Sequence, residues 1–272
     1  MLEEFFRAVA AYPFLTRALA VGVLVGLCAA LLGVNLVLKN YSLIGDGLSH
    51  VGFGAMAVAS AASLAPLAVA VPVVVAAAFL LLRLRESSGV RGDSAIALIS
   101  TASLALGCVV SSRAGANTDL SGYLFGSILS LSQADLWLSV TLSLAVLALF
   151  CIFYNKLFAV TFDETFARAT GTRTGLYNTL LSVLTAVTVV LGMRLMGTLL
   201  ISALIIFPSL SAMRVCTRFR SVVVLAAIVS VFCVLAGLMI SYLADLPTGA
   251  SVVLVNALVF AVLWGAGKLK KA

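Results

Sequence analysis

The sequence predicts an all-α fold, a polytopic bundle of transmembrane helices. Of its 272 residues, 63% are hydrophobic and only 10% are charged, whereas a soluble domain carries about 25% charged residues. Apolar runs of about 20 residues, the length that crosses a bilayer as a helix, recur along the whole chain. With so few charges the chain cannot cover a globular surface in water, so lipid is expected to be its main solvent.

The apolar runs, taken in chain order, predict about nine spans. The second run is rich in Gly and Ser, and the seventh ends at Pro208 and the polar stretch SLSA. Nothing before residue 267 is typical of a linker or a soluble domain, so residues 1–272 are expected to form a single transmembrane domain. The predicted spans are 14–38, 42–64, 66–82, 94–112, 134–154, 175–193, 195–212, 221–243 and 248–267.

The basic residues predict the orientation, because Lys and Arg concentrate in cytoplasmic loops. With nine spans, one set of loops holds Lys39, Arg83, Arg85, Arg91, Lys156, Arg168, Arg173, Arg214, Arg218, Arg220, Lys268, Lys270 and Lys271. The other set holds only Arg7, Arg17, Arg113 and Arg194. The N-terminus is therefore expected outside and the C-terminus in the cytoplasm.

The net charge of +7 is also interpreted as a sign of orientation in the membrane. Its charges lie in short loops without interleaved aromatic residues, so no nucleic-acid partner is expected. The N-terminal stretch MLEEFFRAV is acidic and lacks the basic segment of a cleaved signal peptide. These features together predict a multi-pass membrane protein.

One ionisable pair lies inside the second predicted span. Asp46 and His50, the only histidine, are four residues apart and so share one face of a helix. His50 is expected about 12 Å into the span, near the middle of the hydrocarbon core. A charged group there costs several kcal/mol unless it is paired or hydrated, which makes the pair a candidate functional site.

Imidazole and carboxylate together suit divalent ions such as Zn²⁺, Mn²⁺ and Fe²⁺. Two protein ligands plus waters fit an ion in transit, because a transported ion must also leave. Chemistry alone favours equally a structural hydrogen bond between the two side chains, and a proton relay is a third interpretation.

Four stretches resemble the metal-permease family of ABC transporters, known for zinc, manganese and iron import. The first is GDGLSH after a span that ends in LVLKN, and the second is FDETFARATG at 162–171. The others are MRLMGTLLISALIIFPSLSA at 193–212 and DLPTGASVVLVNALVF at 245–260. They cover nearly the whole chain in the family's order. Gly47, Gly52 and Phe53 depart from the residues that are usual in the family.

The resemblance implies the membrane-spanning permease subunit of an ATP-driven importer in a bacterial cytoplasmic (inner) membrane. It implies a homodimer with the ion pathway near the dimer interface, cytoplasmic ATPase subunits and an extracytoplasmic metal-binding protein. Asp46 and His50 match the family's pathway residues. The cytoplasmic segment 161–172 matches the part that docks on the ATPase, with Asp163, Glu164, Phe166, Ala167, Arg168 and Gly171.

Zinc is the first expectation for the transported ion, because imidazole with carboxylate suits it. Manganese and iron are the alternatives, and no permanently bound cofactor is expected. A less favoured alternative is a proton-coupled secondary metal carrier.

The residues of segment 161–172 support a docking role independently. Asp163 or Thr161 is suited to cap a short helix, and Phe162 and Phe166 would form an apolar projection. The alternative is an amphipathic helix on the membrane surface. Asp245 is expected on the outer side, either attracting cations at the outer mouth or capping the last span.

The sequence lacks the common motifs that would give this chain a catalytic activity of its own. It contains no GxxxxGK[ST] phosphate loop, no HExxH and no GxSxG. ATP hydrolysis is therefore expected in a separate partner chain, and a membrane-embedded enzyme is disfavoured.

Overall fold

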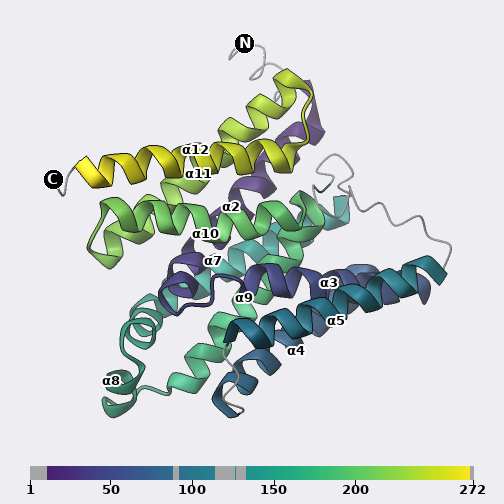
Figure 1. The fold of residues 1–272 in the computed structure, drawn as a ribbon. Helices are drawn as coiled ribbons and strands as arrows, with labels where there is room; N and C mark the ends of the chain where they lie inside the picture. The colour runs from purple at the N-terminus through teal and green to yellow at the C-terminus, as the bar shows by residue number, and fades with distance from the viewer. Residues whose placement is uncertain (1–10, 88–91, 114–125, 127–132, 270–272) are drawn as a thin grey trace.

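The computed structural model describes residues 11–87, 92–113, 126 and 133–269, and all the regular elements in these ranges are helices. Figure 1 shows them in chain order. The elements are α2 (Pro13–Leu38), α3 (Ile44–Ala61), α4 (Pro66–Ser87), α5 (Gly92–Arg113), α7 (Gln133–Phe162), α8 (Glu164–Ala169), α9 (Thr174–Met196), α10 (Thr198–Val215), α11 (Phe219–Ala244) and α12 (Thr248–Leu269).

Each of the nine predicted spans coincides with one long helix, and the all-α fold is confirmed over the described residues. The largest difference is in α7, which was expected to end at residue 154 and continues to Phe162. Polar Asn155 and Lys156 suggested an end there. The helix continues because Leu157 and Val160 are buried against the rest of the protein, so packing outweighs the local polarity.

Seven helices of the described residues are long and apolar enough to cross a membrane: α2, α5, α7, α9, α10, α11 and α12. The apolar part of α4, Ala68–Leu81, is shorter. α3 is outside the set, since Asp46, Ser49 and His50 make it more polar. The chain is thus a multi-pass membrane protein, and the expected count of nine spans is not established by these criteria.

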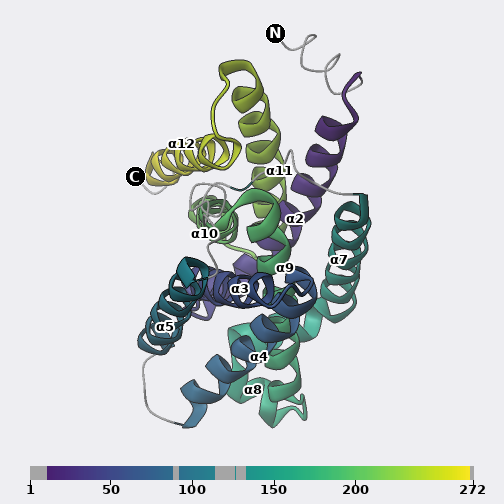
Figure 2. The same cartoon turned by 90° about the vertical axis from the view of Figure 1, so that its right-hand side faces the viewer.

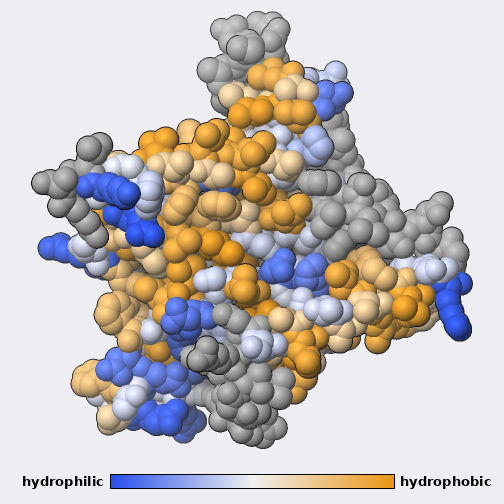
Figure 3. All heavy atoms as spheres, in the orientation of Figure 1, coloured by the Kyte–Doolittle hydropathy of each residue, from blue (hydrophilic) through white to orange (hydrophobic). Residues whose placement is uncertain are grey.

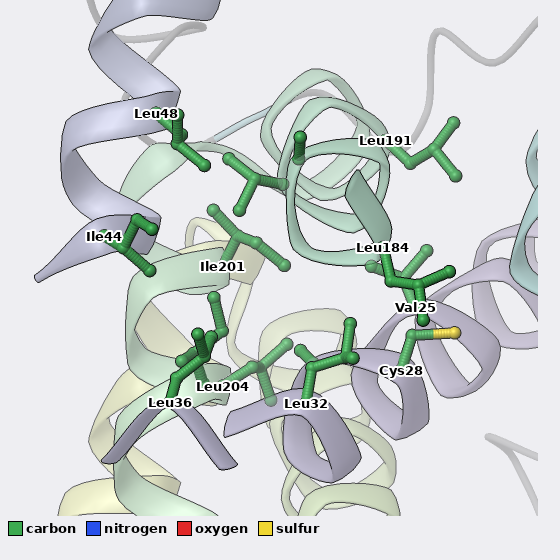
Figure 4. Packing of buried hydrophobic residues seen from close by; sticks show 14 of the residues in the cluster. Val25, Cys28, Leu32, Leu36, Ile44, Leu48, Leu184, Leu191, Ile201 and Leu204 are labelled. Carbon is green, nitrogen blue, oxygen red and sulfur yellow. The ribbon is translucent and has the colours of Figure 1, made fainter. Parts of the chain in front are cut away.

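α2 is the central helix of the bundle, in contact with α7, α9, α10 and α11. α3, α4 and α5 pack together on one side, and α10, α11 and α12 pack together on the other (Figures 1 and 2). Figure 4 shows the apolar layer between these groups. There Leu32 and Leu36 of α2 lie near Ile44 of α3 and near Ile201 and Leu204 of α10, all of them buried.

Small residues allow α2 to approach its neighbours closely. A Cβ on Gly26 would lie 3.0 Å from the Ser230 hydroxyl of α11, which itself donates to the Gly26 carbonyl at 2.8 Å. A Cβ on Gly33 would overlap with the backbone carbonyl oxygen of Ile205 in α10. In a bilayer, such backbone approach replaces the hydrophobic driving force between helices.

The ends of the helices divide between two sides of the molecule. In Figure 1 the α10–α11 connection, the C-terminal end of α12 and α8 all lie at the left, and the α11–α12 turn lies at the opposite side. Hydrophilic residues gather at the left ends and around α8 in Figure 3, and apolar residues cover most of the helices between. Three of the segments expected in the cytoplasm, namely α8, the α10–α11 connection and the end of α12, therefore share one side.

We expect Gly33→Ala to destabilise the bundle, because the added Cβ would overlap with a backbone atom of α10 that has no room to shift. Overpacking of this kind costs about 1–3 kcal/mol. The measurement is the midpoint of thermal unfolding of the purified chain in detergent. Gly175→Ala is the control, since its Cβ would meet nothing within 4 Å. An equal midpoint for the Gly33 variant and the wild type would contradict the close crossing of α2 and α10.

Candidate functional site

α3 is held by helices on several faces. It packs against α4, α5, α9 and α10, and its glycines mark the closest contacts. A Cβ on Gly54 would lie 2.7 Å from the Ser103 carbonyl oxygen of α5, and one on Gly45 would lie 2.7 Å from the Ile205 side chain of α10. Gly47, where the sequence departs from the related family, makes room for the side chain of Ile96 in α5. These contacts fix the rotation of α3 about its axis.

Asp46 and His50 lie on the face that remains open. The Asp46 Oδ2 and His50 Nε2 atoms are 3.6 Å apart, and the side chains are 53% and 20% exposed, respectively. The separation exceeds that of a good hydrogen bond. Asp46 is thus more than half exposed and His50 is partly exposed, so the pair is not sealed in a dry contact, and the Asp46 carboxylate is accessible to an ion or to water.

The candidate site contains two side chains of ligand chemistry, Asp46 and His50. No group of three or more His, Cys, Asp or Glu side chains suited to a metal occurs in the part of the chain that the structure describes. A histidine and a carboxylate with open positions can bind a divalent ion weakly and leave room for waters.

The second candidate site is the short helix α8, whose N-cap residue was predicted from the sequence. Asp163 is its N-cap, and the Phe166 backbone N–H donates to the Asp163 carboxylate at 2.9 Å. The helix ends before Gly171, which has a φ of +81°, a value that suits glycine. Ala167 is buried beneath the helix.

Two aromatic side chains project from this segment. Phe162, the last residue of α7, and Phe166 of α8 are 70% and 66% exposed. Exposed phenylalanines are side chains that a groove on another protein can cover. Both rings are exposed as expected, but they belong to two successive helices and not to one short helix.

A polar cluster attaches α8 to two other helices. Glu164 accepts a hydrogen bond from the Asn178 side chain of α9 at 3.1 Å and lies 3.6 Å from the ammonium of Lys39. Lys39 also donates to Asn178. Arg168, on the exposed side of α8, lies 3.5 Å from Glu164. Lys39 follows the last residue of α2 and precedes α3, so the cluster joins α8 to the segment that leads into the helix of Asp46 and His50.

The contacts of Glu164 with Lys39 and Asn178 could not be predicted from the sequence. Lys39 and Asn178 lie 125 and 14 residues away along the chain, and nothing in the spacing pairs them. The only available signal was a lysine and an asparagine at predicted helix ends. A second bond of this kind links α7 to α2, where Thr161 donates to the buried Asn35 at 2.9 Å.

Asp245 is not brought near the Asp46–His50 pair. It is the C-cap of α11, exposed and in a left-handed conformation with a φ of 51°. It lies at the α11–α12 turn, which is apart from α3 in both ribbon views (Figures 1 and 2). The structure thus gives Asp245 a position at a helix end, and its expected function at an outer mouth stays a prediction.

The chain is similar to known proteins over nearly its whole length. A model of the ABC 3 transport family matches residues 11–265. The chain is 30% identical to the manganese import system permease protein ScaB of Streptococcus gordonii, over 96% of this chain and 94% of that protein. It is 32% identical to the manganese transport system membrane protein MntC of Halalkalibacterium halodurans, over 96% of this chain and 90% of that protein.

Two further similarities bear on the metal and on the fold. The chain is 30% identical to the chelated iron transport system membrane protein YfeD of Yersinia pestis, over 93% of this chain and 85% of that protein. A solved structure of PsaBC from Streptococcus pneumoniae in complex with Fab superposes with a TM-score of 0.87 at 31% identity. This match covers 97% of this chain and 95% of the solved one.

We expect Asp163→Ala to loosen α8, because the Phe166 N–H loses its acceptor. Loss of an N-cap costs about 1 kcal/mol, or roughly a fivefold faster local opening. Hydrogen exchange of the peptide that contains Phe166 measures this in the purified chain. Asp163→Asn keeps a capping oxygen and is the control. Equal exchange rates in Asp163→Ala and the wild type would mean that the cap does not hold the helix.

Proposed function

The chain belongs to the ABC 3 transport family, and from this premise we propose that it is the permease subunit of an ATP-driven importer of divalent metal ions. The observation that carries the proposal is the half-open Asp46–His50 pair, 3.6 Å apart on a helix that the other helices hold in place. Both side chains supply metal ligands, and their exposure leaves positions for water or for further ligands.

Manganese is the ion we propose first, with iron as the alternative. The relatives named above transport manganese or chelated iron according to their names. The expectation of zinc from the sequence gains no support from them. The ligand types of the pair are compatible with manganese in place of zinc, because carboxylate and water suit Mn²⁺ and imidazole is accepted by several divalent metals.

We propose that α3 and α4 also cross the membrane, which gives nine spans with the N-terminus outside and the C-terminus in the cytoplasm. α3 can be more polar than a lipid-facing helix because α4, α5, α9 and α10 cover it. The orientation is supported by Arg214, Arg218, Arg220 and Lys268, whose helix ends lie on the same side as α8 in Figure 1. A bacterial cytoplasmic membrane suits this arrangement and the bacterial sources of these relatives.

The partners that we propose follow from two features: the chain lacks a nucleotide-binding loop, and it exposes apolar side chains. The sequence has no nucleotide-binding loop, so an ATPase subunit supplies energy and docks on segment 161–172 through Phe162 and Phe166. A second copy of the chain completes the ion site, since one copy offers two ligands and α5, beside α3, exposes apolar Leu98, Leu106 and Val109. An extracytoplasmic protein delivers the ion.

We expect Asp46→Asn and His50→Ala each to reduce metal uptake by at least about tenfold, the loss that even outer-sphere partners of a metal ligand cause. Uptake of radioactive manganese into cells that depend on this transporter measures the effect, with membrane levels of each variant checked by immunoblot. Ser60→Ala, an exposed change on the same helix, is the control. Full uptake by both variants would remove the ion pathway from this pair.

Competition in the same assay separates the choice of metal from the transport function. Unlabelled manganese is expected to compete best and zinc least. Stronger competition by zinc would overturn manganese as the preferred ion and leave the permease function standing.

We expect Phe166→Ala to weaken attachment of the ATPase subunit, because Phe166 is an exposed aromatic anchor of the docking segment. Truncation of an aromatic anchor costs about 2 kcal/mol or more, at least about thirtyfold in affinity. Co-purification of the ATPase from cells that express both subunits measures this. Phe232→Ala, on α11 and 56% exposed against 66% for Phe166, is the control. Normal co-purification of the Phe166 variant would place docking elsewhere.

A further inference from the structure

A cavity of about 460 Å³ lies where the second half of α7 meets the start of α11. Aromatic rings form its wall: the Phe219 ring lies 4.7 Å from that of Phe158 and 5.6 Å from that of Tyr154, centroid to centroid. The lining residues are Tyr154, Asn155, Phe158, Arg218, Phe219 and Arg220. None of them belongs to the ion site or to the exposed part of the docking segment.

The charge of this cavity is uncompensated. Arg218 and Arg220 make no ion pair within the described residues. The first turn of α11 holds no acidic residue, and its N-cap Arg218 makes no side-chain cap bond. Two cationic side chains beside the positive end of the α11 helix dipole are electrostatically unfavourable. A bound anion would relieve this repulsion and accept hydrogen bonds from both guanidinium groups.

Arg220 also lines a second, apolar cavity of about 390 Å³ on the outside of α11. Val224 and Ile228, one turn apart, are 58% and 59% exposed there, with Leu225 beside them. Ile228 lies about 12 Å along the helix from Arg220. A cavity that carries both arginines at the end of the helix is therefore followed by an apolar groove along the membrane-spanning part.

We propose that these two cavities form one site for an anionic phospholipid of the cytoplasmic leaflet. Its phosphate binds Arg218 and Arg220 beside Tyr154 and Asn155, and one acyl chain lies along Val224 and Ile228. The inference rests on the proposed orientation, which places the start of α11 at the cytoplasmic headgroups, where basic residues attract anionic lipid.

The apolar groove favours lipid over a protein partner. A cytoplasmic ATPase subunit could contact the end of α11. It could not reach the apolar groove, which lies one to two turns further along the helix, inside the bilayer, where acyl chains already fill the space. The cavity also adjoins the docking segment, because the ring of its lining residue Phe158 lies 5.4 Å from the ring of Phe162.

The test is native mass spectrometry of the full purified chain in detergent, titrated with phosphatidylglycerol, phosphatidylcholine or glycerol 1-phosphate. We expect wild type to retain phosphatidylglycerol in preference to phosphatidylcholine, and glycerol 1-phosphate not to displace it. The double variant Arg218→Ala/Arg220→Ala should bind phosphatidylglycerol about 25-fold more weakly, at about fivefold for each charge removed.

Matched variants distinguish the loss of this lipid site from a general loss of surface charge and from misfolding. Arg173→Ala removes one charge at an exposed position at the start of α9 and should change binding less than twofold. Arg218→Lys/Arg220→Lys keeps the charge and should restore most of the binding. Ile228→Ser should weaken phosphatidylglycerol binding with both arginines intact. Circular dichroism and gel filtration check the fold of each variant.

Several outcomes would overturn the proposal. Displacement of the lipid by glycerol 1-phosphate would indicate a site for free phosphate. An equal loss in Arg173→Ala would indicate general surface charge. Full lipid retention by the double alanine variant, together with loss of ATPase co-purification, would assign the arginines to protein docking. Because lipid is measured on the isolated chain, none of these results depends on metal uptake.

Discussion

The constraint on which the rest of the structure depends is an acid and an imidazole on a helix that the other helices of the bundle enclose. A helix that carries Asp46, Ser49 and His50 cannot face lipid on every side without a penalty of several kcal/mol. The fold meets this constraint by covering α3 with four other helices and by using glycines to bring α5 and α10 close to it. One face stays open, and that face carries the two ionisable groups.

The same packing connects the two functional regions that we propose. Lys39 lies at the end of α2, a few residues before α3 begins, and it contacts Glu164 of the docking helix and Asn178 of α9. A shift of α8 against the bundle would disturb these contacts first. The short segment between α2 and α3 is thus the nearest covalent connection between the proposed ATPase-docking surface and the ion site.

Much of this arrangement was predictable from local sequence features. Apolar runs located the helices, the four-residue spacing placed Asp46 and His50 together, and Asp163 before a short amphipathic stretch indicated the cap. What could not be predicted depends on contacts between distant residues. The continuation of α7 to Phe162 comes from burial of Leu157 and Val160, and the attachment of Glu164 comes from helices far along the chain. Ligand chemistry alone also did not separate zinc from manganese, since both accept imidazole and carboxylate.

The length of α7 has a mechanical consequence. Its 30 residues form a helix about 45 Å long, whereas the hydrocarbon core measures about 30 Å. The helix is therefore about 15 Å, or nearly three turns, longer than the core, and α8 follows its end with only Asp163 between them. Because Leu157 and Val160 near this end are buried against the rest of the protein, a displacement of α8 would reach the bundle through a continuous helix, which resists bending more than a loop does.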